Sequence, residues 1–357
     1  MKKVLLKFGK WIGILLAAVV IFAVGFVLVL TITEYNPEDT VSLSIQGTPS
    51  KELHEGDSLT IMTWNIGFGA LGDNADFFMD GGTHVMPSTK ERVNENLNSM
   101  LWTIEEEAPD VLFVQEIDEN AKRTYHINEM KMFMGRLDGY QSSLAYNFKT
   151  LYVPYPIPPI GKVNSGIATF SSYPVTDSTR VKLPCPFSYP VRIANLKRCL
   201  MVDRVPIEGS DRELVLVNLH LEAYDSGEGK AAQTKMLRDI LEAEAATGNY
   251  VIAGGDFNQV FSNVDVSAYP VYEGRWQPAS IDASEFGEGL TFVADNSAPT
   301  CRSLDSPYEG ADKENFQYYL IDGFIVSSNV TVDEVSTLDL DFAATDHNPV
   351  KMRVTLH

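Results

Sequence analysis

The sequence predicts a mixed α/β domain of layered sheets and helices, behind one long apolar helix at the N-terminus. Short runs of β-forming apolar residues alternate along the chain with two amphipathic helical stretches. Some of these runs are separated by hairpin-like turns, as at residues 208–211, so the sheets should not be purely parallel. The first thirty-odd residues are far more apolar than the rest of the 357-residue chain, so they form an element of their own.

Residues 11–30 make up the apolar helix. They hold no charged side chain, and Lys2, Lys3, Lys7 and Lys10 precede them. At about 1.5 Å per residue, this run matches a hydrocarbon core of roughly 30 Å. A cleavable signal peptide has a shorter apolar stretch and a small-residue cleavage site, so we favour an uncleaved transmembrane anchor over a signal peptide. The lysines should stay in the cytoplasm, which predicts a single-pass protein of the cell membrane with its remainder outside the cytoplasm.

These features divide the chain into three parts. Residues 1–33 form the anchor, residues 34–57 are polar and should form a stalk or linker, and residues 58–357 form the folded domain. At the start of the first amphipathic helix, Ser88 and Glu91 make a capping box.

The part outside the anchor is strongly acidic. Residues 1–33 hold four of the 28 basic residues and no acid, so 24 basic and 48 acidic side chains remain, a formal charge of −24. Such a domain repels polyanions unless a basic patch or a metal intervenes, and the chain has no Lys/Arg-rich stripe. Nucleic acid is therefore a disfavoured partner, although acidic surfaces often serve solubility alone.

Polar residues able to bind a metal or move a proton stand where the apolar strands end. They are Asn65, Glu116, His220, Asp256 and Asp322, with Asp346 and His347 just before a further strand. Each has an ordinary explanation, because an Asp after a strand is usually a turn former or helix cap and a lone His is usually structural. Strand ends at one edge of a sheet converge in space, however, and α/β sites form there. The whole set therefore indicates a functional site.

The residue types favour one kind of chemistry. Carboxylate and amide oxygens without thiolates suit a hard cation such as Mg²⁺ or Mn²⁺. Hydrolysis at phosphorus needs negative charge neutralised, a water activated and a leaving oxygen protonated, which carboxylates and two histidines can support. The chain has no G-x-x-x-x-G-K-[ST] loop, G-x-S-x-G elbow or H-E-x-x-H motif, which removes the commonest rival classes.

Six short motifs resemble those of the endonuclease/exonuclease/phosphatase superfamily, in that family's order and over about residues 59–357. They are Thr63-Trp64-Asn65, Gln115-Glu116, Asn218-Leu219-His220, Gly255-Asp256-Phe257-Asn258, Ile321-Asp322 and Thr345-Asp346-His347-Asn348-Pro349-Val350. The resemblance implies a four-layer α/β/β/α sandwich with two central mixed β-sheets, here preceded by the transmembrane helix. It also implies a divalent-metal-dependent hydrolase acting on phosphoester bonds.

The resemblance further implies a role for each motif residue. Asn65 and Glu116 would hold the divalent metal, with Asp346 nearby as a further ligand and part of the catalytic group. Asp256 would orient or deprotonate the attacking water, and Asn258 would contact the phosphate.

Two histidines complete the implied catalytic set. His347 would form a dyad with Asp322, and would stabilise the pentacoordinate phosphorus or act as a base. His220 would contact the phosphate or assist the leaving group.

Two local stretches bear on the branch of the family. Residues 220–229 resemble the His-x-x-Ala-x-Asp-Ser-x-x-Gly segment of secreted bacterial sphingomyelinases, or form a loop in which Asp225 and Ser226 cap the next helix, or both. Residues 151–160 are apolar, proline-rich and uncharged. They either face the lipid interface or form a rigid loop packed on the flank of the domain.

Three function classes therefore compete. A phosphodiesterase acting on lipid or head-group substrates fits the anchor, the negative charge and the sphingomyelinase-like stretch, and we expect this class. An extracellular nuclease fits the motifs equally well but not the charge. A catalytically inactive binding module is the third class, and the intact set of polar residues counts against it.

Overall fold

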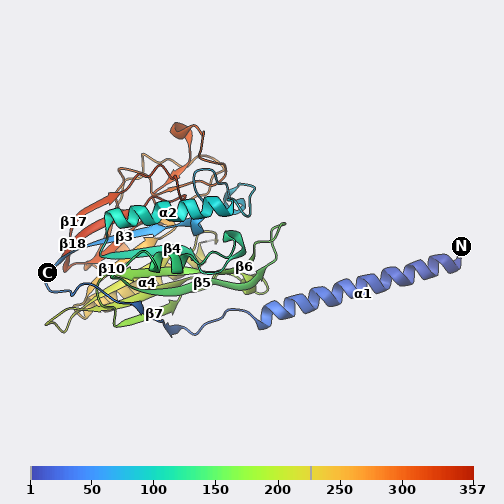
Figure 1. The fold of residues 1–357 in the computed structure, drawn as a ribbon, viewed down its shortest axis with the longest axis horizontal. Coiled ribbons are helices and arrows are strands. Elements are labelled where there is room, and N and C mark those ends of the chain that lie inside the picture. The colour runs from blue at the N-terminus through green and yellow to red at the C-terminus, as the bar shows by residue number, and fades with distance from the viewer. Residues whose placement is uncertain (1, 226) are drawn as a thin grey trace.

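Two seven-stranded sheets pack face to face in the computed structural model, which describes residues 2–225 and 227–357 (Figure 1). The first sheet has the order β1 (Thr40–Ser42), β7 (Asp177–Lys182), β8 (Cys199–Pro206), β9 (Glu213–His220), β10 (Tyr250–Asp256), β16 (Asp322–Ser327) and β13 (Leu290–Val293). The second has the order β17 (Val330–Thr337), β18 (Val350–Leu356), β3 (Ser58–Asn65), β4 (Val111–Asp118), β6 (Gly161–Ser171), β5 (Gln141–Val153) and β2 (Gln46–Gly47). Two small ladders pair β11 (Gln259–Phe261) with β12 (Ala279–Ile281) and β14 (Cys301–Arg302) with β15 (Tyr318–Tyr319).

Helices cover the outer faces of the two sheets. Leu97 of α2 (Lys90–Glu107) belongs to a buried cluster with residues of the second sheet, which the short α3 (Glu129–Met134) also joins. Leu241 of α4 (Glu228–Ala246) is buried in a cluster with residues of the first sheet.

A third apolar cluster fills the space between the sheets. Phe113 on β4 and Phe324 on β16 are both fully buried in it. The layers therefore run helix, sheet, sheet, helix, and the predicted α/β/β/α sandwich is confirmed.

Strand pairing explains why the polar strand ends converge. In the first sheet Asp256 lies at the end of β10, directly between His220 on parallel β9 and Asp322 on antiparallel β16. In the second sheet β3 and β4 are parallel, so Asn65 pairs with Gln115 and sits beside Glu116. The carboxyl ends of these parallel strands meet at one edge of the sandwich.

Helix α1 (Lys2–Ile32) projects from one end of the domain (Figure 1). Its segment Leu6–Ile32 is long and apolar enough to cross a membrane. Apolar side chains along this segment are exposed, as Phe22 is at 74%. The helix is thus one candidate membrane span.

Two local predictions need correction. Residues 34–57 are not a free stalk, because they add β1 to the first sheet and β2 to the second, and Leu53 is buried between the sheets. The cap of α2 is Thr89 rather than Ser88, since Thr89 Oγ1 accepts from Arg92 N at 3.2 Å. Ser88 instead donates to Ala70 O, an interaction that local sequence spacing does not reveal.

A buried carboxyl group in the first sheet yields a stability prediction. Asp203 on β8 is 1% exposed, and burial raises its pKa from the ordinary 3.8 to about 6. The folded state therefore binds more protons than the unfolded state between these pH values, so this group destabilises the fold as the pH rises through that window. Asp203→Asn should increase the free energy of unfolding at pH 7 by on the order of 2 kcal/mol and change it little near pH 4.

Denaturation of both proteins at the two pH values checks this expectation. Asp211→Asn, in the turn between β8 and β9, is the matched control, because Asp211 is exposed. An equal effect of Asp203→Asn at both pH values would contradict the assignment.

Candidate active site

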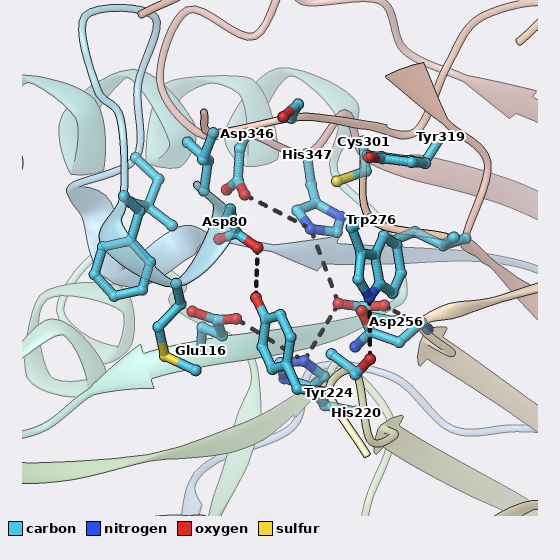
Figure 2. Close-up of a pocket in the computed structure, with 18 of the residues that line it drawn as sticks. Asp80, Glu116, His220, Tyr224, Asp256, Trp276, Cys301, Tyr319, Asp346 and His347 are labelled. Atoms are coloured by element: carbon cyan, nitrogen blue, oxygen red, sulfur yellow. Dashed lines mark hydrogen bonds and ion pairs between the residues drawn. The ribbon is translucent and has the colours of Figure 1, made fainter. Parts of the chain in front are cut away.

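A cavity of about 540 Å³ opens at the edge where these strands end (Figure 2). Six of the eight residues predicted from the sequence line it: Glu116, His220, Asp256, Asn258, Asp346 and His347. The other two, Asn65 and Asp322, are each 2% exposed and contact residues that line the cavity. The fold therefore brings the whole predicted set together, from segments as distant as β3 and the loop before β18.

Asn65 links the two carboxylates nearest to it. Its Nδ2 donates to Glu116 Oε1 at 3.3 Å and to Asp256 Oδ2 at 3.1 Å. Its Oδ1 accepts from Gly67 N at 3.0 Å. In this arrangement Asn65 orients the carboxylates, whereas the predicted role as a metal ligand would use the oxygen that Gly67 N contacts.

Glu116 reaches the cavity from an irregular point in its strand. The register of β4 against β6 shifts between Val114 and Ile117, and Glu116 has a φ of 57°. A non-glycine residue rarely adopts this left-handed conformation, and a bulge of this kind redirects a side chain out of the regular alternation.

His347 and Asp322 form a close pair. His347 Nδ1 lies 2.9 Å from Asp322 Oδ2, and His347 Nε2 lies 3.8 Å from Asp256 Oδ2. Burial alone would lower the pKa of His347, but the negative charge of Asp322 and its hydrogen bond raise that pKa well above the usual value. The imidazole is therefore held in its charged form.

His220 has the opposite electrostatic setting. Its Nε2 lies 3.3 Å from Asp256 Oδ2 and 3.9 Å from Glu116 Oε1. Burial lowers the pKa of His220 well below the usual value, and the positive charges of Arg198 and His347 lower it further. One neutral and one charged imidazole thus flank Asp256, an arrangement that separates proton-accepting and proton-donating roles.

The carboxylates that line the cavity are close together and mostly buried, so they repel one another. Burial raises the pKa of Asp256 to about 7, and the charge of Asp322 adds to the shift. Burial likewise raises the pKa of Glu116 and of Asp346. A divalent cation would relieve both the burial and the repulsion, and these oxygen donors suit Mg²⁺ or Mn²⁺. The residues present therefore fit such an ion.

In the described part of the chain, two groups of three side chains have ligand atoms within 4.8 Å of one another: Asp256 with Asp322 and His347, and Cys301 with Asp346 and His347. Burial raises the pKa of Cys301 to about 12, so it remains a thiol and a poor ligand. Asp346 is the member of that set with the charge to hold a hard cation, and Thr345 Oγ1 steadies it with a hydrogen bond of 3.2 Å.

Sequence reasoning missed several residues that line the cavity. Tyr224 OH donates to Asp80 Oδ1 at 2.6 Å across the cavity, and Trp276 Nε1 donates to Ala223 O at 3.1 Å (Figure 2). Arg198 also lines the cavity and is 4% exposed. Tyr224 lies in the sphingomyelinase-like stretch, which could have indicated it; the other residues carry no motif.

The sphingomyelinase-like stretch also caps a helix, which is one of the two interpretations that its sequence left open. Asp225 Oδ2 accepts from Gly229 N at 2.5 Å and from Lys230 N at 3.2 Å at the start of α4. Ser226, the second predicted cap, lies outside the described residues.

A comparison with protein-family models identifies the family to which this chain belongs. The model of the Endonuclease/Exonuclease/phosphatase family matches residues 62–342, which is well over half of the chain. The chain therefore belongs to this family, as its motifs predicted. It is an enzyme of the phosphoesterase and nuclease type, in a family whose members hydrolyse phosphoesters and generally depend on a metal.

Solved structures agree on the fold. An endonuclease/exonuclease/phosphatase protein from Beutenbergia cavernae DSM 12333 is similar with a TM-score of 0.57 and 20% identity, over 84% of this chain and 72% of that one. The human Nocturnin catalytic domain with bound sulfate anion has a TM-score of 0.52 and 16% identity, over 88% and 97%. A family member from Bacteroides vulgatus has a TM-score of 0.52 and 15% identity, over 84% and 100%. The search of curated proteins gave no match.

Glu116→Gln tests the candidate metal site. The change removes an anionic donor while keeping the size of the side chain, so we expect at least ~10-fold weaker binding of Mg²⁺ or Mn²⁺ and an unchanged thermal midpoint. Calorimetric titration with each metal measures the affinity. Glu106→Gln, at an exposed position on α2, removes the same charge as a control. Unchanged affinity and full activity at saturating metal would count against Glu116 as a ligand.

His347→Ala tests the dyad. Turnover should fall by at least ~10²-fold, because a positioned proton-transfer group contributes about that much. The double variant with Asp322→Ala should lose little more, since the two side chains act through one imidazole. A loss of less than about threefold in His347→Ala would show that this residue is a bystander.

Proposed function

We propose that this protein is a membrane-anchored phosphodiesterase that acts outside the cytoplasm on lipid or head-group phosphoesters. Mg²⁺ or Mn²⁺ is its proposed cofactor. One observation carries the proposal: a single cavity gathers Glu116, Asp346, Asp256 and both histidines in a domain that is joined directly to an apolar helix.

The proposed chemistry is attack of water on phosphorus. A cation bound by Glu116 and Asp346 would neutralise charge on the phosphoryl oxygens. Asp256 is buried between the two imidazoles and is the proposed acceptor of the proton of the attacking water. His347, kept charged by Asp322, would stabilise the negative charge that develops on the phosphoryl group.

Three further residues would hold the substrate or help the leaving group depart. Asn258 lines the cavity; its backbone N–H donates to Asp256 Oδ1 at 2.8 Å, which fixes the Asp256 side chain, and its Nδ2 donates to Leu221 O at 3.0 Å. His220 is neutral and its Nε2 lies 3.3 Å from Asp256 Oδ2, so it can accept the proton that Asp256 takes from the water and pass it on to the leaving oxygen. Arg198 also lines the cavity, and the positive charge of its guanidinium would attract a phosphoryl oxygen, while its Nε lies 3.8 Å from Glu222 Oε2.

The lipid class of substrate rests on charge and location. A formal charge of −24 outside residues 1–33 disfavours a polyanion such as duplex DNA, whereas a single head group presents one phosphate. The candidate span Leu6–Ile32 would keep the cavity close to a lipid surface. The likeness of residues 220–229 to a sphingomyelinase segment points the same way.

Hydrolysis assays on the full chain test the proposal. Sphingomyelin in vesicles, plasmid DNA and a soluble generic phosphate bis-ester would each be supplied with Mg²⁺ or Mn²⁺, with and without a chelator, and His347→Ala would serve as the inactive control. We expect metal-dependent release from sphingomyelin and the bis-ester. Cleavage of DNA alone would establish the nuclease class instead, and no hydrolysis by metal-loaded protein would support an inactive binding module.

A further inference from the structure

Two uncharged loops expose apolar side chains at one end of the domain. One is the tip between β5 and β6, residues 151–160, and the other is residues 183–191. Their most exposed apolar side chains are Leu151 at 52%, Tyr155 at 71%, Ile157 at 93%, Tyr189 at 54% and Val191 at 57%, which we call the apolar rim. Side chains this exposed are unusual as a group in a domain with so negative a charge, and such patches mark interaction sites.

The apolar rim is adjacent to α1. The ring of Phe26 meets that of Tyr152 edge to face, with 5.9 Å between centroids, and Tyr189 OH lies 3.4 Å from Thr31 Oγ1. Leu30 is buried to 5% exposure although it belongs to the apolar run. Phe26 lies four residues before Leu30, about 6 Å along the helix into that run. The tip of β5 and β6 therefore reaches alongside residues expected to meet lipid, and it leaves the domain at the same end as α1 (Figure 1).

The junction between α1 and the domain is held by charge pairs as well as by packing. The carboxylate of Glu34 lies 3.5 Å from Arg192 Nε and 3.4 Å from Lys197 Nζ, and its side chain is only 9% exposed. The ring of Tyr35 packs on that of Tyr146 at 6.3 Å. A helix attached in this way fixes which face of the domain is turned to the membrane.

We propose that the apolar rim is a second membrane-contact surface, which inserts into the interface of a phospholipid bilayer around the outer end of α1. This inference rests on the proposed membrane anchoring. Tyrosine side chains prefer this interface, and each aliphatic side chain of the rim gains by leaving water.

The contact would turn the cavity toward its substrate. Phe148 on β5 and Ile160 just before β6 line the cavity together with Leu196, which follows the second loop. The ring of Tyr155 also packs on Phe78, at 6.3 Å, in the loop that carries Asp80 into the cavity. Docking of the apolar rim therefore sets the mouth of the cavity next to the lipid head groups.

The depth of the apolar rim in a bilayer tests the inference directly. The full chain carrying Ile157→Cys in a Cys185→Ser background would be labelled with a polarity-sensitive thiol dye and reconstituted into phosphatidylcholine vesicles. Cys199 and Cys301 are buried and should not react. We expect blue-shifted emission and quenching by lipids with a spin label on the acyl chain.

The matched control carries the same dye at Trp102→Cys. Trp102 is also an exposed apolar residue, at 60%, but it lies on α2 and outside the apolar rim, so its dye should emit as in water. A water-like, unquenched signal at position 157, equal to that at position 102, would overturn the inference.

A second measurement separates this inference from the proposed function. Ile157→Asp should lower the ratio of vesicle-lipid hydrolysis to soluble bis-ester hydrolysis by at least ~10-fold, while Trp102→Asp should leave the ratio unchanged. An unchanged ratio in Ile157→Asp would contradict the role of the rim. If the parent chain hydrolyses neither substrate, the proposed function fails. The dye emission at position 157 still shows whether the apolar rim contacts lipid. Flotation of the protein with vesicles shows independently whether α1 anchors it.

Discussion

The concentration of acidic groups at one edge of two packed sheets constrains the rest of this molecule. Asp256 is paired in register between His220 and Asp322, so its position is set by backbone hydrogen bonds and not by a flexible loop. Burial and mutual repulsion raise the pKa of Asp256 and of Glu116. Such a site is stable only with compensating positive charge, which a cation and the His347 imidazolium can supply. The same positive charge would attract an anionic phosphoester to the site.

The two histidines differ because their neighbours differ, although both are buried. His347 faces Asp322 at 2.9 Å and is held charged, while His220 lies close to Arg198 and is held neutral. The two histidines therefore differ in pKa because the packing of the two sheets gives them different neighbours. This division gives the site a charged group and a neutral group at neutral pH without any unusual residue type.

The N-terminal helix and the catalytic domain form one structural unit at their junction. Residues 40–42 and 46–47 enter the two sheets, and Glu34 is held by Arg192 and Lys197. A chain tethered by a loose stalk could present any face to a membrane, whereas under the proposed anchoring this junction would restrict the choice to one. The proposed orientation of the cavity would follow from that restriction.

The sequence alone determined the layered α/β class, the apolar span and the family, because strand periodicity, an uncharged twenty-residue run and six ordered motifs are local signals. It also predicted the site residues as a set, since polar residues at strand ends share a recognisable position. Only the tertiary structure decided that residues 34–57 join both sheets, that Tyr224 bridges to Asp80 and that Arg198 enters the cavity. These contacts join segments far apart in the chain, and pairing at that distance depends on packing, which no local pattern of side chains encodes.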